Sequence, residues 1–337
     1  MKSILIDIGH PAHVHLFKHL IFNLRKMECR VVVTSRKKDI TESLLDYYGI
    51  EHFCLSRAPK QTKWMALELI KRDFSVFRLH RRHRFDLALG TSVSIAHLSA
   101  LSKVKSFVFE EDDDAVLPLF SSITYPFATK IIVPDCLQYK KWGKKRMVHS
   151  SYHELAYLHP DVFTPDETVL NRYQLKPYTY IVMRHSALKA HHDLHQVGLK
   201  REINERILDL LKGYSLVSSR EDEDTGNIQP WDMHHVLAFS RMVISDSQTM
   251  TAEAACLGVP SIRYNSFVGR ISYLEELEHR YDLSYGFGPG DEKKMYEKVA
   301  ELLSEKNYKE CWREKKVGML KDKVNFYQWM NNLILSS

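Results

Sequence analysis

The stretch Met242–Pro260 has the order of residue types that a phosphate-binding helix needs. It contains a short apolar strand, a polar turn and a helix of small and helix-forming residues that ends at Gly258. Asp246 or Ser247 suits the N-cap position, and glycine fits the left-handed conformation just beyond a helix end. A helix that begins directly after a buried parallel strand points unpaired N–H groups at the sheet edge, where phosphates bind. The segment therefore predicts an anion site, with an ordinary capped strand–turn–helix as the alternative.

Other polar residues are expected at the same site. Gln248 and Thr249 form the first turn of the helix, and Glu253 lies one turn further on, where its carboxylate would accept hydrogen bonds from a ribose. Arg184 and Ser186 follow the strand-like segment before them and suit phosphate binding. Ser219 follows the next strand. Three loops that meet at one sheet edge predict a nucleotide-diphosphate site, and none of them matches a P-loop or a G-x-G-x-x-G fingerprint.

Three histidines stand at the carboxyl end of the first strand, where open α/β sheets bind their ligands. His13 falls near the start of the first helix and is a candidate general base, because the pKa of histidine is close to neutral pH. His10 and His15 are expected on the acceptor side of the site. The His13-x-His15 pair also suits a metal ion, and structural histidines are a third interpretation.

An acidic run, Glu110–Asp114, follows the strand Ser106–Phe109. Glu110 and Asp112 are candidate catalytic carboxylates. A member of the run could supply the base if His13 does not, or could bind sugar hydroxyls, and like charges would raise some of their pKa values. The alternative is a solvated acidic loop that caps the next helix.

Composition limits the class of protein. The chain has 337 residues, 44% of them hydrophobic and 27% charged, with a formal charge of +6, which suits a globular protein with an anionic partner. No apolar run is long enough to span a membrane, and no signal peptide is expected. Five scattered cysteines without a C-x-x-C pair indicate free thiols in a reducing cytoplasm.

A basic segment, Arg57–Arg84, carries nine Lys and Arg interleaved with apolar and aromatic residues. This is the composition of a helix that lies on an anionic membrane surface, with a solvated basic helix face as the alternative. No nucleic-acid-binding motif supports a nucleic-acid partner.

The elements that must position these residues alternate between strands and helices, a βαβ rhythm that predicts parallel sheets covered on both faces. Between residues 134 and 177 the rhythm breaks, and we interpret this passage as interdomain. The predicted domains are residues 1–160, residues 161–320, and a C-terminal helix, 321–337, that packs back on the first domain. The predicted strands are 4–8, 30–34, 52–55, 87–89, 106–109, 130–133, 178–183, 215–218, 242–245 and 261–264. The predicted helices are 14–26, 39–48, 62–83, 94–102, 200–211, 231–239, 249–257, 292–304 and 308–334.

Three segments resemble one known family. Asp7–His15, Tyr157–Pro165 and Asp246–Ala255 are similar to the family of domain of unknown function 354. The two α/β halves, the returning helix and the turn before Glu253 resemble the GT-B fold of nucleotide-sugar glycosyltransferases and UDP-N-acetylglucosamine 2-epimerases.

Two shorter matches suggest roles for individual residues. His13-Val14 resembles the Gly-Gly-His-Val segment of the N-acetylglucosaminyltransferase that completes lipid II, with Pro11 and Ala12 in place of two glycines. Asp246-Ser247 followed by Glu253 resembles the Asp-Ser-Gly-Gly-x-x-x-Glu motif of the 2-epimerases. Here Gln248-Thr249 replace the glycine pair, which leaves less room for the backbone to approach a diphosphate.

These resemblances imply a metal-independent glycosyltransferase that uses a UDP-sugar, without another cofactor, in bacterial surface-polysaccharide or glycolipid assembly. A lipid-linked acceptor would then enter between the domains, with the protein in the cytoplasm and attached reversibly to the inner face of the membrane. A UDP-N-acetylhexosamine 2-epimerase is the alternative, and a metal-dependent hydrolase using His10, His13 and His15 is a lesser one.

Overall fold

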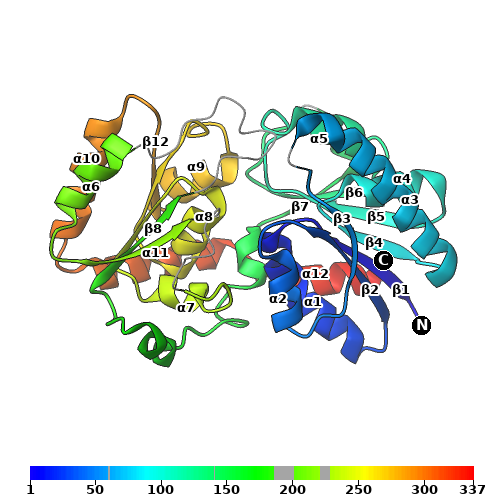
Figure 1. The fold of residues 1–337 in the computed structure, drawn as a ribbon, viewed down its shortest axis with the longest axis horizontal. Coiled ribbons are helices and arrows are strands. Elements are labelled where there is room, and N and C mark those ends of the chain that lie inside the picture. Colours follow the sequence, from blue (N-terminus) through cyan, green and yellow to red (C-terminus); the bar gives the residue numbers. More distant parts are fainter. Residues whose placement is uncertain (60, 140, 186–200, 221–227) are drawn as a thin grey trace. The chain divides into compact units, whose positions relative to one another are not determined.

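A computed structural model describes residues 1–59, 61–139, 141–185, 201–220 and 228–337 (Figure 1). The chain forms two compact units. Unit 1 comprises Met1–Tyr157 and Asn325–Ser337, and unit 2 comprises Leu158–Val324. Each unit is built on its own parallel sheet.

Unit 1 contains a seven-stranded sheet in the order β3-β2-β1-β4-β5-β6-β7, and every neighbouring pair is parallel. β1 is buried along its whole length, as expected of a central strand covered on both faces. The strands are β1 (Ser3–Ile8), β2 (Arg30–Lys37), β3 (Phe53–Arg57), β4 (Leu87–Gly90), β5 (Lys105–Phe109), β6 (Lys130–Pro134) and β7 (Arg146–His149).

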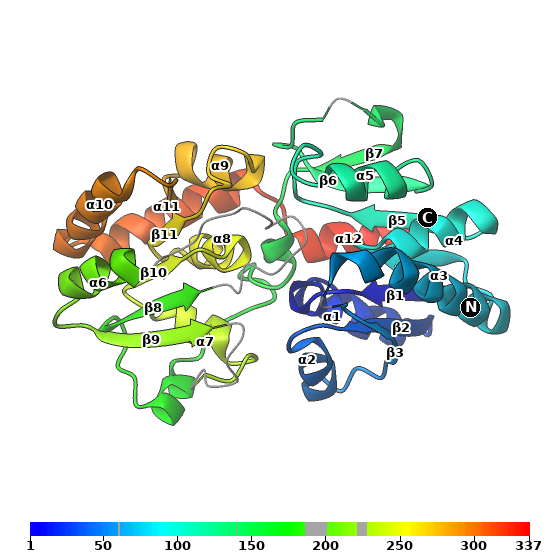
Figure 2. The same cartoon turned by 45° about the horizontal axis from the view of Figure 1, so that its top comes forward.

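Helices cover both faces of this sheet. α1 packs on β1 and β2 and contacts α2 and α12, whereas α4 packs on β4 and β5 and contacts α3 and α5, so the two groups form separate layers (Figure 2). The helices of unit 1 are α1 (Pro11–Lys26), α2 (Thr41–Tyr47), η1 (Thr62–Trp64), α3 (Met65–His83), α4 (Val93–Leu101), α5 (Pro118–Thr124), η2 (Gly143–Lys145), η3 (His153–Ala156) and α12 (Phe326–Ser336).

Unit 2 contains a five-stranded parallel sheet in the order β12-β11-β10-β8-β9. Its strands are β8 (Tyr180–His185), β9 (Ser215–Arg220), β10 (Met242–Ser245), β11 (Ser261–Tyr264) and β12 (Ser284–Phe287). Its helices are η4 (Glu167–Tyr173), α6 (Arg201–Leu210), α7 (Met233–Ala238), α8 (Gln248–Leu257), α9 (Ser272–His279), α10 (Glu292–Ser304) and α11 (Tyr308–Asp322). α8 packs on β10 and β11 at the centre of the unit.

The predicted fold class is confirmed, since two parallel-sheet α/β units and a helical C-terminus are present. Two predictions of local structure were wrong. The passage 134–177 is not only interdomain, because β7 within it adds an edge strand to the sheet of unit 1. The single helix predicted over 308–334 is two helices, and residues 323–325 between them carry the chain from unit 2 to unit 1.

Candidate functional site

The three predicted ligand loops of unit 2 do begin at one edge of its sheet. Strand pairing places Ser219 of β9 beside Arg184 of β8, and Arg184 beside Ser245 of β10. Arg263 of β11 continues this row on the other side of Ser245. The side chain of Ser219 is not described, and Ser186 lies outside the described residues.

The start of α8 has the predicted cap. Ser247 is the N-cap, and its Oγ accepts the N–H of Met250 at 3.4 Å, while its own N–H donates to Ser245 Oγ at 2.8 Å. At the other end Gly258 has φ 77°, the left-handed conformation predicted for it. The N–H groups of Gln248 and Thr249 have no carbonyl partner within the helix, because they belong to its first turn. Both residues are half-buried, so a ligand at the sheet edge can reach these donors.

The turn before α8 is held from β11. Asn265, which follows β11, donates from its side-chain amide to the carbonyl of Asp246 at 2.9 Å, and both residues are buried. The polar turn is therefore fixed in place before any ligand binds.

Glu253 has a protein partner that the sequence did not suggest. Its Oε1 lies 3.0 Å from Nε2 of His234 on α7, and both side chains are buried. The contact ties α7 to α8 and orients the carboxylate of Glu253.

Arg263 is a second residue of this region that the sequence did not suggest. It is 1% exposed, and its Nη2 donates to Glu275 on α9 at 3.1 Å. Burial lowers the pKa of its guanidinium, while Glu275 opposes that shift. This buried ion pair anchors α9 beside the row of residues at the sheet edge.

In unit 1, His13 lies in the first turn of α1. Its Nδ1 accepts the backbone N–H of Gly9 at 3.3 Å. Burial, together with the charge of Lys38, lowers its pKa to about 4, so the ring is neutral at pH 7. A neutral ring whose Nδ1 accepts a hydrogen bond carries its hydrogen on Nε2. His13 therefore offers a hydrogen-bond donor to a ligand, whereas the sequence predicted a base.

The other two histidines of the motif have different surroundings. His10 is the N-cap of α1, and its Nδ1 accepts the N–H of Ala12 at 3.2 Å. His15 is buried, with its ring centroid 5.4 Å from that of Tyr157 and 6.1 Å from that of Tyr48. Residues two apart on a helix point to different faces, so His13 and His15 do not converge on one ion.

Glu110 lies at the end of β5 and is 5% exposed. Its Oε1 accepts the backbone N–H groups of Glu111 at 3.1 Å and Asp112 at 3.3 Å. Burial, reinforced by the nearby charge of Asp112, raises the pKa of Glu110 to about 8. A carboxyl that is protonated at neutral pH can act as a proton donor.

Most of the acidic run is bound within the unit, so the alternative of a solvated loop does not hold. The carboxylate of Asp113 accepts the N–H of Gln138 at 2.9 Å, and Asp114 accepts two hydrogen bonds from Arg146 at 2.6 Å. Glu111 Oε2 lies 3.3 Å from Nδ1 of His153, a buried histidine that the sequence analysis did not single out.

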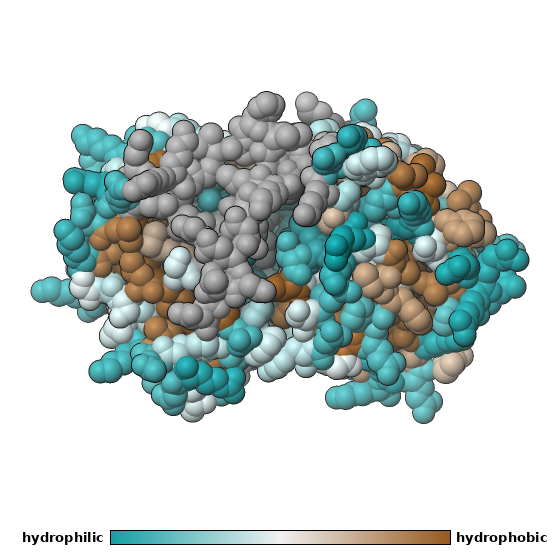
Figure 3. All heavy atoms as spheres, in the orientation of Figure 1, coloured by the Kyte–Doolittle hydropathy of each residue, from teal (hydrophilic) through white to brown (hydrophobic). Residues whose placement is uncertain are grey.

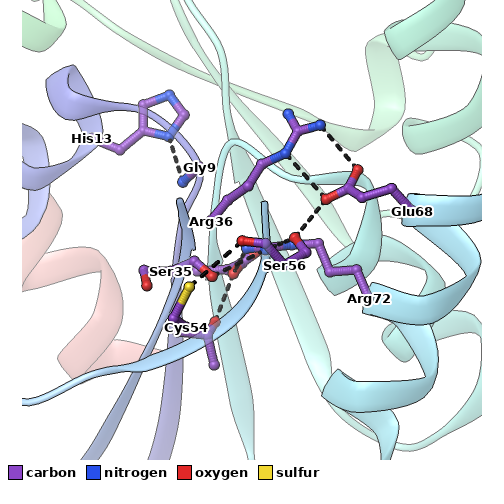
Figure 4. Close-up of polar contacts among 10 residues, drawn as sticks. Gly9, His13, Ser35, Arg36, Cys54, Ser56, Glu68 and Arg72 are labelled. Atoms are coloured by element: carbon purple, nitrogen blue, oxygen red, sulfur yellow. Dashed lines mark hydrogen bonds and ion pairs between the residues drawn. The ribbon is translucent and has the colours of Figure 1, made fainter. Parts of the chain in front are cut away.

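A chain of ion pairs and hydrogen bonds runs from Asp7 in β1 to Arg36 near the end of β2. Figure 4 shows its part from Arg72 to Arg36. Asp7 is paired with Arg72 of α3 and accepts the hydroxyl of Thr34 at 2.6 Å. Arg72 donates to Ser56 Oγ at 2.9 Å, and Ser56 donates to Glu68 at 2.5 Å. Glu68 in turn accepts two hydrogen bonds from Arg36 of β2, at 3.1 and 2.9 Å.

Gly90, at the end of β4, allows β4 to lie close to the end of β1. Its φ is 153°, and a Cβ placed on it would lie 2.6 Å from the carbonyl oxygen of Asp7. No larger residue fits there without moving β1, which carries the Gly9–His13 turn.

The sequence matches one family, described as "Protein of unknown function (DUF354)", over residues 2–269. The chain belongs to the DUF354 family. A comparison with curated proteins found no match.

Solved structures of known enzymes share the fold of this DUF354 protein. A UDP-GlcNAc 2-epimerase from Neisseria meningitidis, bound to UDP-GlcNAc, is 12% identical with a TM-score of 0.70, covering 99% of this chain and 100% of that one. The S. aureus MnaA–UDP structure is 14% identical with a TM-score of 0.65, covering 91% and 90%. The spinosyn forosaminyltransferase SpnP is 13% identical with a TM-score of 0.65, covering 99% and 98%. The fold is that of the GT-B nucleotide-sugar enzymes, as predicted.

Proposed function

We propose that this protein is a metal-independent glycosyltransferase that takes its sugar from a UDP-sugar and assembles a bacterial surface polysaccharide or glycolipid. One observation carries the proposal: a capped helix, α8, begins at the carboxyl edge of a parallel sheet, beside Arg184. Its free N–H groups and the guanidinium suit the two phosphates of a nucleotide diphosphate. We keep the donor-binding residues that the sequence predicted. Glu253 binds the ribose of the donor, and the remaining donor-binding residues are Ser186, Ser219, Asp246, Gln248 and Thr249.

The solved structures that share the fold support a uridine nucleotide. Of the three described above, two were determined with UDP or UDP-GlcNAc bound. No cofactor beyond the nucleotide sugar is proposed.

We assign the chemistry to unit 1. Glu110 and Asp112 supply the carboxyl groups that exchange protons, and His13 donates a hydrogen bond from Nε2. His10 and His15 border the acceptor side, where His10 shapes the turn and His15 packs beneath it.

The exposed face of α3 supports a lipid-linked acceptor. Ile70 is 65% exposed and Phe74 is 68% exposed, and Trp64 and Leu67 are exposed beside them. Exposed basic residues of the same helix, Lys71, Arg78, Arg81 and Arg82, surround this apolar stripe. Apolar groups also lie among polar ones over the helices of unit 1 in Figure 3. No helix among the described residues is both long and apolar enough to cross a bilayer. We propose that α3 rests on the anionic inner face of the cytoplasmic membrane.

A thermal-shift panel of nucleotides and nucleotide sugars tests the proposal. UDP and one UDP-sugar should raise the melting temperature, since a ligand that binds only the folded state stabilises it, and the shift should persist in EDTA. A protein that UDP does not stabilise, or that responds only to a divalent metal, would contradict the proposal.

A second candidate function is a UDP-N-acetylhexosamine 2-epimerase. The raised pKa values of Glu110 and Glu111, both caused mainly by burial, favour it, because inversion at a sugar carbon needs proton donors and acceptors close together. UDP-GlcNAc incubated without an acceptor separates the two functions. An epimerase yields a product of the same mass with inverted configuration at C2, whereas a transferase returns the substrate.

A further inference from the structure

Arg36 stands at the outer end of the ionic chain described above. Its Nε and Nη2 bind the two oxygens of Glu68, and the side chain is 24% exposed. Nη1 takes part in neither contact, so it stays available to a ligand that approaches from outside the sheet. Figure 4 shows this side of the guanidinium turned away from Glu68.

The contacts behind Arg36 fix its position. Glu68 is itself held by Ser56, and Ser56 by Arg72, whose partner Asp7 is fully buried. Burying such charges is costly unless each one is paired, and here Asp7 pairs with Arg72 and Glu68 with Arg36. An arginine held side-on by a fixed carboxylate loses little further freedom when it binds an anion, and Nη1 keeps N–H groups that can donate to a phosphate oxygen.

The turn that carries His13 lies near the same position. Ile8 pairs with Ser35, so Arg36 stands beside the turn that leads from β1 to His13. Nδ1 of His13 accepts the N–H of Gly9, so the neutral ring carries its hydrogen on Nε2, and this hydrogen can be donated to an anion.

We propose that Arg36 and His13 form a binding site for an oxyanion, a phosphate or pyrophosphate group, on unit 1. Nothing in the family or the fold comparison assigns these residues to a ligand together. The site deepens the proposed function, since the group it binds would be the phosphate of a lipid-linked acceptor or the diphosphate of the donor.

Calorimetric titration of the full-length protein with inorganic pyrophosphate tests the site, and it needs no sugar substrate. Arg36→Met should weaken pyrophosphate binding by about tenfold or more, the loss expected when a charge-assisted hydrogen bond is removed. Lys103→Met removes the same charge from an exposed position elsewhere in unit 1 and should leave the affinity unchanged. Equal affinities of wild type and Arg36→Met, or an equal loss in the two variants, would overturn the proposal.

Repeating the titration with saturating UDP identifies the source of the oxyanion. If wild type still binds pyrophosphate and Arg36→Met does not, the site serves the acceptor. If UDP displaces pyrophosphate and Arg36→Met also weakens UDP binding, the site serves the donor. A protein that binds no UDP but loses pyrophosphate binding on Arg36→Met would refute the proposed function and keep this site.

A second variant and the ring resonances of His13 show whether a loss of binding comes from the site itself or from misfolding. Arg36→Lys keeps the charge but cannot bind Glu68 through two nitrogens, so it should show an intermediate loss. The ring resonances of His13 should move when pyrophosphate is added to wild type and stay in place in Arg36→Met. A His13 ring that ignores pyrophosphate in wild type contradicts its place in the site.

Discussion

Single side chains in unit 1 have protonation states that their surroundings determine. Glu110 is buried at the end of β5 with a raised pKa, and His13 is neutral because burial lowers its pKa. The sequence predicted that like charges would raise some pKa values in the acidic run, as Asp112 does for Glu110. It could not show the larger cause, burial, because that depends on the segments that pack around each side chain. The residue types alone indicated that proton chemistry belonged at these two strand ends.

Glu110→Gln should change how stability depends on pH. Between pH 4.5, the ordinary pKa of the carboxyl, and about 8, folded Glu110 holds a proton that the unfolded chain releases. The free energy of unfolding therefore falls as pH rises through this window, by up to about 5 kcal/mol from this group. Glutamine cannot ionise, so urea denaturation at pH 5, 7 and 9 should show a shallower fall in the variant. Parallel pH profiles for the two proteins would refute the assigned protonation state.

Replacements of His13 distinguish a hydrogen-bond donor from a base. His13→Ala should lower turnover by about 10²–10³-fold, the usual cost of removing one positioned hydrogen-bond donor, with UDP affinity little changed. His13→Gln places an amide N–H near the position of Nε2–H and should recover about tenfold of that loss. Release of UDP from a UDP-sugar measures both variants. A glutamine variant as slow as the alanine variant would mean that the ring acts as a base.

Among the elements, α8 and α3 were predicted well because their sequences are locally complete. The α8 segment contains its own cap, helix formers and terminal glycine, and the observed helix differs from the predicted one by a single residue at its start. β7 was missed because its four residues include only Met147 and Val148 as apolar side chains. The pairs Glu253–His234 and Arg36–Glu68 join different elements, so no local pattern could reveal them.

Glu253→Gln tests the role of the carboxylate on α8. Glutamine keeps an oxygen that can accept a hydrogen bond from His234, so the melting temperature should change little. UDP affinity should fall by about tenfold, because the charge that would bind the ribose hydroxyls is lost. Calorimetry and thermal unfolding on the same sample separate the effects. Normal affinity with a much lower melting temperature would make Glu253 purely structural.

The exposed face of α3 predicts binding to anionic vesicles. The protein should sediment with phosphatidylglycerol vesicles more than with phosphatidylcholine vesicles, and salt should weaken the binding. Replacing Arg78, Arg81 and Arg82 with glutamate should release it without lowering its UDP affinity. Glutamates at Lys293, Lys294 and Lys306, exposed in unit 2, make the same change in charge and should have little effect. If the wild-type protein forms dimers and does not bind anionic vesicles, the apolar stripe is instead an interface with a second copy of this chain.

At the scale of the whole molecule, the last helix belongs to the unit that holds the first strand. Phe326 of α12 is fully buried in unit 1, with its ring 4.1 Å from His149 and 5.4 Å from His153. The apolar face of this segment predicted that it would pack on the first domain, as it does. The break between α11 and α12 was not predicted, because both helices have continuous helical patterns.

Phe326→Ala should destabilise unit 1 by about 3–5 kcal/mol, the usual cost of emptying a buried aromatic site. Hydrogen exchange should show lost protection in β5 and β7, with β10 of unit 2 little affected. Leu277→Ala, at a fully buried site of α9, is the matched control and should weaken unit 2 instead. Equal loss of protection in both units would show that they unfold together.

The return of α12 also sets the order in which the protein can be completed on the ribosome. Unit 2 is one continuous stretch, residues 158–324, whereas unit 1 needs residues 325–337, which are synthesised after unit 2. Domains generally fold as their chain emerges, the N-terminal one first. Here the N-terminal unit must wait with Phe109, His149 and His153 uncovered while the whole of unit 2 is made, so the nascent chain has a long interval in which a chaperone can bind that surface.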